Sequence, residues 1–190
     1  LDSSFKSGYL TTSPSSAWYA PFREMLQFIK HADLDVTFLI PPAHVSYYHA
    51  LEVSDLWQKH KDMLRTLSRG INEYSVAKST RVIDFTGFNE FTTELSEKGG
   101  SRLAYWQDAD HFNCTLAAKI IDRVADLSVD VSQYATKYDD SLFGVPIESR
   151  SIESHIKALD LSVSAWRQQN PDKMRILDRR IGASGYSDVH

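Results

Sequence analysis

Two short apolar runs, separated by one amphipathic helix, constrain the fold of this chain most strongly. The first run covers residues 35–40 and is closed by Pro41 and Pro42, and the second covers residues 81–85. Short, nearly continuous apolar runs are typical of strands buried on both faces, as in a parallel sheet. A helix between two such strands makes a βαβ unit. The sequence therefore predicts a three-layer α/β fold in which helices flank a mostly parallel sheet.

Four segments carry apolar side chains at helical spacing, which indicates helices with one buried face each. The four stripes are Phe22, Met25, Leu26 and Ile29; Leu56, His60, Met63, Leu64, Leu67 and Ile71; Phe112, Leu116, Ala117, Ile120, Ile121 and Val124; and Ile152, Ile156, Leu159, Val163 and Trp166. Ser54 is expected to cap the second helix, and Asn113 the third. The fourth helix is a C-terminal helical extension that either docks on the domain or contacts a partner.

The composition is that of an ordinary globular chain, with 190 residues, 42% hydrophobic and 24% charged. A net charge of −4 without a basic run gives no reason to expect nucleic acid as a partner. No apolar stretch has the length of a membrane span, and no signal peptide is visible. The chain begins at Leu1 rather than methionine, which leaves room for an upstream segment. The single cysteine, Cys114, excludes an internal disulfide and is expected to be a small buried thiol.

Residues 105–113 hold aromatic side chains, two aspartates and a histidine directly before the third predicted helix. Within this stretch, Asp108 and His111 follow the spacing Asp-x-x-His. A carboxylate so placed can accept a hydrogen bond from one imidazole nitrogen, which leaves the other nitrogen free to take a proton from a nucleophile. The same spacing also fits a polar loop in which His111 only starts the helix.

An ordered series of motifs over residues 20–150 resembles the distal half of a bacterial branch of the SGNH (GDSL-like) hydrolases. The series is a Pro-x-His end at His44, a helix with Trp57, an Asp-Phe-x-Gly strand from Asp84, the stretch 105–113 with its helix, and residues 140–144 before a late helix. The resemblance implies an SGNH- or flavodoxin-like half sheet and an esterase or acyltransferase. Its substrates would be O-acyl groups, carried by a small molecule or a glycan of the bacterial cell envelope.

In that family a late Asp-x-x-His supplies two members of a Ser-His-Asp triad. The resemblance therefore implies that His111 is the general base and that Asp108 orients it. It also divides the chain into a lead-in loop (1–19), an α/β hydrolase-like core (20–127), an irregular segment with the C-terminal amphipathic helix (128–181), and a tail (182–190).

The other parts of an SGNH active site are absent from the sequence. There is no Gly-Asp-Ser nucleophile motif and no Gly-x-Asn-Asp motif, and Ser3 and Ser4 follow an aspartate without the preceding glycine. The chain can be a fragment, it can associate with a second chain that carries the serine, or it can have lost the chemistry. A half sheet leaves an exposed edge and an uncovered apolar face. We therefore predict that a missing N-terminal segment or a second chain completes the fold.

Four further residues are candidates for lining the pocket: His44, Asp84, Asn89 and Trp106. His44 and Asp84 come at the carboxyl ends of the predicted strands, where ligands bind in open α/β sheets. Each has a structural alternative. His44 can bind a backbone carbonyl from its loop, and Asp84 can brace the loop that follows it.

Two other functions remain open. The missing nucleophile and the aromatic-rich loops also fit a non-catalytic binding or assembly module. A third interpretation is a metal site at Asp108, Asp110 and His111. His44 or Asp84 would complete that ligand set, but no metal-binding signature such as His-Glu-x-x-His is present. We expect neither a metal nor another cofactor.

Overall fold

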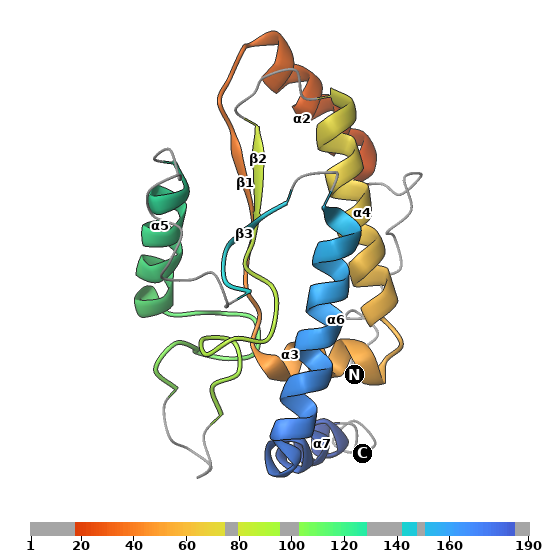
Figure 1. Cartoon of the computed structure of the whole chain (residues 1–190), viewed down its shortest axis with the longest axis vertical. Coiled ribbons are helices and arrows are strands. Elements are labelled where there is room, and N and C mark those ends of the chain that lie inside the picture. Colours follow the sequence, from red (N-terminus) through yellow and green to blue (C-terminus); the bar gives the residue numbers. More distant parts are fainter. Residues whose placement is uncertain (1–17, 75–79, 96–102, 129–141, 148–150, 185–190) are drawn as a thin grey trace, which may run out of the picture.

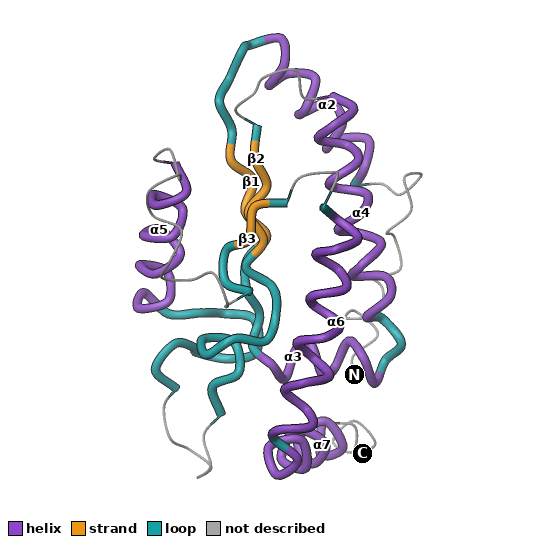
Figure 2. The backbone as a smooth tube through the Cα atoms, viewed as in Figure 1, coloured by secondary structure: helices purple, strands orange, loops and turns teal. Residues whose placement is uncertain are grey.

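The computed structural model describes residues 18–74, 80–95, 103–128, 142–147 and 151–184. These residues form a mixed α/β structure that is mostly helical (Figures 1 and 2). The helices are α2 (Tyr19–His31), α3 (Val45–Val53), α4 (Trp57–Tyr74), α5 (Cys114–Ser128), α6 (Ile152–Gln169) and α7 (Pro171–Ser184), and the strands are β1 (Thr37–Ile40), β2 (Arg81–Asp84) and β3 (Val145–Pro146). None of these helices is both long and apolar enough to cross a membrane.

The three described strands form one small sheet in the order β1-β2-β3. The two predicted strands are present, and β1 pairs with β2 in parallel from Thr37↔Arg81 to Ile40↔Asp84. The third strand, β3, runs antiparallel to β2. The sheet is therefore mixed in this part of the chain, with one parallel and one antiparallel pair of strands, and a mostly parallel sheet in a three-layer fold stays a prediction. The third strand was missed because only two residues pair, which is too short for an apolar run to reveal.

The side chains of β2 alternate between two apolar clusters, one on each face of the sheet. Val82 belongs to the cluster formed with α2, α4 and α6, and Ile83 belongs to the cluster formed with α5. This alternation is the ordinary consequence of strand geometry. Figure 1 shows α5 on one side of the sheet and α2, α4 and α6 on the other. Both faces of β2 are thus covered, as its continuous apolar sequence requires.

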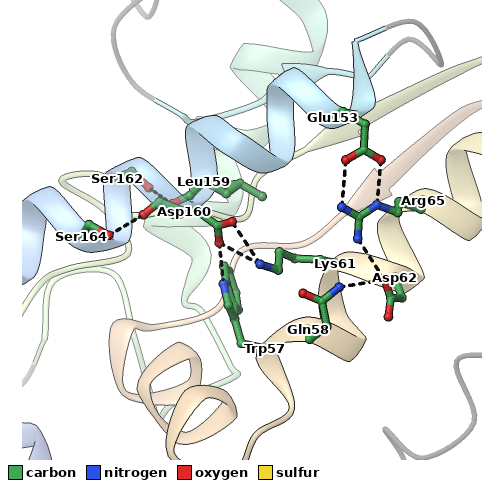
Figure 3. A network of polar contacts seen from close by, with 10 residues as sticks. All are labelled: Trp57, Gln58, Lys61, Asp62, Arg65, Glu153, Leu159, Asp160, Ser162 and Ser164. Carbon is green, nitrogen blue, oxygen red and sulfur yellow. Dashed lines mark hydrogen bonds and ion pairs between the residues drawn. The ribbon is translucent and has the colours of Figure 1, made fainter.

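The late helix α6 docks on the domain, which was one of its two predicted alternatives. Three polar contacts with α4 hold it there (Figure 3). The indole nitrogen of Trp57 donates to Asp160 at 2.8 Å, and the Lys61 ammonium lies 3.0 Å from the same carboxylate. Arg65 makes two parallel hydrogen bonds with Glu153, at 2.7 and 2.8 Å. Such a bidentate pair fixes orientation as well as adding energy.

The chain then continues into α7, a second late helix that was not predicted from the sequence. Asp178 on α7 accepts a hydrogen bond of 2.8 Å from the buried His49 on α3. The ring of His49 also contacts Arg167 near the end of α6. This network ties the last two helices to α3.

Helix α3 has no counterpart among the predicted helices. Val45, Tyr48, His49, Ala50 and Leu51 are all buried, which is more than one face of a short helix. The polar–apolar periodicity that reveals a surface helix is therefore missing. The predicted helix N-cap at residue 54 is also wrong. That serine is the C-cap of α3, and α4 begins only at residue 57.

Candidate active site

Two backbone contacts hold the loop 105–113 in place. An isolated antiparallel bridge joins Trp106 to Phe112, so the segment between them forms a closed turn. The backbone N–H of His44 donates to the carbonyl of Ala109 at 3.0 Å. This bond ties the loop to the start of α3, at the carboxyl end of β1.

The helix that follows the loop begins as predicted. The side-chain oxygen of Asn113 accepts hydrogen bonds from the N–H groups of Thr115 (2.9 Å) and Leu116 (3.3 Å), which is N-cap geometry. Leu116 is fully buried, so the first turn of α5 is fixed to the core. Cys114, the first residue of α5, is exposed, and the prediction of a buried thiol is wrong. It lies on the outer side of the first turn, opposite Leu116.

Asp108 and His111 form a pair within this loop. Nδ1 of His111 lies 2.8 Å from each carboxylate oxygen of Asp108. The same carboxylate accepts the backbone N–H of His111 at 2.8 Å and of Asp110 at 3.1 Å. The two side chains are exposed, at 69% for His111 and 57% for Asp108. Among the described residues, Nε2 of His111 has no hydrogen-bond partner.

The electrostatics of the pair favour the ionised forms, a carboxylate at Asp108 and an imidazolium at His111. The backbone hydrogen bond from Asp110, with those from His111, lowers the pKa of the Asp108 carboxyl well below its usual range. The hydrogen bond and charge of Asp108, with the charge of Asp110, raise the pKa of His111 above its ordinary 6.5. The imidazole therefore becomes a free base only at a higher pH than an isolated histidine.

A cavity of about 220 Å³ opens at the carboxyl ends of β1 and β2, beside this loop. It is lined by Ile40, Pro41, Pro42, Ala43, Tyr47, Tyr48, His60, Met63, Thr86 and Asp110. Asp110 connects the cavity to the pair, because its carboxylate lies 3.1 Å from Nδ1 of His111. This is the region where open α/β sheets bind ligands.

The His44 side chain is buried and bonded on both ring nitrogens. Nδ1 accepts the backbone N–H of Ser46 at 3.2 Å, and Nε2 lies 2.5 Å from the carbonyl oxygen of Glu94. The carbonyl contact requires the proton on Nε2, so this tautomer caps α3 through Nδ1. The arrangement is the structural alternative given above, a loop histidine that binds a backbone carbonyl.

Asp84 is fully buried and braces the loop after β2. Its carboxylate accepts the N–H and the hydroxyl of Thr86, both at 2.8 Å, and Nε2 of His155 at 2.7 Å. His155 lies on α6, so this Asp–His pair connects the sheet to the late helix. The sequence analysis did not identify His155, because its partner lies far away along the chain.

Asn89 and Trp106 also have partners within the fold. The side-chain oxygen of Asn89 accepts the N–H groups of Phe91 (3.0 Å) and Thr92 (3.1 Å), which closes a tight turn. The indole N–H of Trp106 donates to the carbonyl of Phe91 at 2.7 Å. Neither side chain borders the cavity described above, and a binding role for either stays a prediction.

The three residues of the possible metal site lie close together. Asp108, Asp110 and His111 each offer one ligand atom, and these atoms lie within 4.8 Å of one another. The three residues can hold a metal ion only if Nδ1 of His111 gives up its hydrogen bond to Asp108. His44 and Asp84 direct their polar atoms to the fold, so they do not complete the set.

His60 is the cavity residue that the sequence analysis used only as a member of the buried stripe of α4. A histidine inside an otherwise apolar stripe is a usable signal, because buried polar side chains are uncommon.

Comparison with known proteins found no matching family model, no similar curated protein and no similar solved structure.

Proposed function

We propose that this chain is part of an SGNH-like esterase or acyltransferase and supplies the His–Asp pair of a Ser-His-Asp triad. The observation that carries the proposal is the geometry of the loop 105–113. Asp108 holds Nδ1 of His111 at 2.8 Å, the His111 side chain is exposed, and the adjacent Asp110 lines a cavity at the carboxyl ends of the strands. Helices on both faces of the sheet also fit a three-layer fold of this kind.

The chemistry assigned to the pair follows from its bonding. The Asp108 carboxylate fixes the tautomer with the proton on Nδ1, so Nε2 accepts the proton of a serine hydroxyl as it attacks an ester carbonyl. Asp108 then stabilises the imidazolium. Nε2 next gives the proton to the departing alcohol, and the acyl group passes from the serine to water or to an acceptor hydroxyl.

The serine and the oxyanion donors would come from an N-terminal segment upstream of this chain or from a second chain. Strand β1 supports this, because it lies at an edge of the described sheet. Leu39 on β1 is 46% exposed, whereas its partner Ile83 on β2 is buried beneath α5. A further strand beside β1 would cover Leu39 and bring new loops to the carboxyl ends of the strands.

Labelling with a fluorophosphonate, which reacts with activated serines, tests the proposal. The protein is expressed from its complete reading frame, together with any chain that co-purifies. We expect labelling that His111→Ala reduces about 100-fold or more, because a general base contributes roughly 10²–10⁴ to such steps.

His31→Ala is the matched control, because His31 is also exposed and its ring bonds only a carbonyl of its own helix, that of Gln27. Labelling that is absent, or equal in the two variants, would reject the catalytic role. It would leave the non-catalytic binding or assembly module as the function of this fold.

A further inference from the structure

The cavity at the carboxyl ends of β1 and β2 offers a ligand mainly apolar and aromatic surface. Pro41 and Met63 belong to its lining, and the first is exposed while the second is half-buried. Tyr47 is the half-buried aromatic residue of the lining, whereas Tyr48 and His60 are buried. A ligand in the cavity is therefore held by contact with hydrocarbon and aromatic groups rather than by a set of polar side chains.

The charge beside this surface is negative. Asp110 is the charged residue of the lining, and its side chain is 61% exposed. Asp108 adds a second carboxylate on the same loop, and the backbone N–H of Asp110 helps to hold its pKa well below the usual range. The imidazole of His111 offsets at most one of these two charges. Burial lowers the pKa of His60, so that ring is neutral near pH 7 and adds no positive charge to the lining.

The two properties together select one kind of ligand. An aromatic ring and a carboxylate both attract a cation, and the carboxylate repels an anion. A primary ammonium needs acceptors for its three N–H donors, which an apolar wall does not supply. A quaternary ammonium has no N–H group, and its methyl groups pack against side chains such as Pro41 and Met63. The cavity therefore suits a cation whose own surface is apolar.

We propose that this cavity binds a small quaternary ammonium group and that Asp110 is its counter-ion. The volume of about 220 Å³ lies below the roughly 300–1,000 Å³ of sites for drug-sized molecules, so the ligand is a small trimethylammonium compound or the end of a longer chain. The inference goes beyond the proposed function, because binding requires neither a serine nor a base at His111.

Three probes of similar shape and different charge test the proposal: choline, its neutral isostere 3,3-dimethylbutan-1-ol, and the anion 3,3-dimethylbutanoate. Each is titrated into the full chain and followed by NMR. We expect choline to bind at least about threefold more tightly than the neutral isostere, because contacts of a partly exposed cation with a carboxylate and an aromatic ring are each modest. The anion should bind most weakly. Equal affinity for choline and its isostere overturns the proposal, as does the absence of choline binding in the millimolar range.

Asp110→Asn removes the charge of the counter-ion and keeps the shape of the side chain. In this variant we expect most of the preference for choline over its isostere to disappear. Asp122→Asn is the matched control, because Asp122 is an exposed residue of α5 with the same charge and does not line this cavity. It must leave the preference unchanged. A preference that survives Asp110→Asn overturns the proposal.

The methionine methyl groups give an independent readout of where choline binds. The chain has three methionines. Met63 lines the cavity, whereas Met25 is exposed on α2 and Met174 lies on α7. In the wild-type protein labelled with ¹³C at these methyl groups, choline must shift the Met63 resonance and leave that of Met25 unchanged. An unshifted Met63 resonance at saturating choline overturns the proposal whatever the variants do.

Discussion

Among the Asp–His pairs of the described residues, two have almost equal length and opposite environments. In the loop pair, His111 and Asp108 are 2.8 Å apart, and their side chains are 69% and 57% exposed. In the core pair, His155 and Asp84 are 2.7 Å apart, and their side chains are 4% and 0% exposed. The distance alone does not distinguish a catalytic pair from a structural one. What separates them is where the remaining polar atoms of each pair point.

Each carboxylate uses its other lone pairs differently. Asp84 bonds Thr86 and His155, which joins β2, its following loop and α6 into one unit. Among the described residues, Asp108 bonds the backbone and side chain of its own loop, and the histidine that it holds is 69% exposed with no hydrogen-bond partner at Nε2. The core pair is therefore assigned to stability. The loop pair is the one with an atom available to a substrate.

Breaking the core pair is expected to have the largest effect, a loss of free energy of unfolding. Asp84→Ala leaves His155 and Thr86 without their buried acceptor, and removing one partner of such a buried pair costs about 3–5 kcal/mol. Chemical denaturation should show this loss as a lower midpoint. Asp108→Ala, the same change in the exposed pair, should leave the midpoint unchanged. Equal effects of the two variants would contradict the division between the pairs.

Acid should destabilise the protein through the buried His60. Its folded pKa lies below the ordinary 6.5, so the unfolded chain binds a proton first as the pH falls. Stability is therefore lost as the pH drops below 6.5, by up to about 1.4 kcal/mol for each pH unit until the folded pKa is reached. Denaturation at about pH 7.5 and about pH 5.5 should show this loss, and His60→Phe should reduce it. An unchanged pH dependence in the variant would contradict the burial of a neutral imidazole.

A smaller effect is expected at the exposed pair, on pKa rather than on stability. Asp108 raises the pKa of His111, so Asp108→Asn should move that pKa downward, toward 6.5. NMR titration of the His111 ring measures the change directly. A pKa of His111 that stays in place would mean that the hydrogen bond to Asp108 is not formed in solution.

The sequence predicted the local parts of the structure and not the long-range ones. Asp108 and His111 are three residues apart, so their contact follows from the loop itself and from the cap at Asn113. The partner of Asp84 lies on α6, and no pattern in the sequence connects that strand to His155. The cavity also depends on packing, because its walls come from β1, α3, α4 and three loops that meet only in the folded protein.

The same difference between local and long-range contacts explains which helices and strands were predicted from the sequence. Helices α2, α4, α5 and α6 each bury one face, and the spacing of apolar residues predicted most of each stripe. Met25 and Ile121, which were included in the stripes of α2 and α5, are exposed. Helix α3 is buried on several sides and β3 pairs through two residues only, so neither leaves a periodic signal. That His60 borders a cavity could be seen only in the tertiary structure.

The most direct test of the account is the rate at which the protein from the complete reading frame hydrolyses p-nitrophenyl acetate. If the loop pair is the proposed catalytic base, His111→Ala lowers kcat/KM by about 100-fold or more while thermal unfolding stays unchanged, because both side chains of the pair are exposed. A rate for His111→Ala within about twofold of His31→Ala would contradict it, and the loop pair would then be a structural feature of the loop.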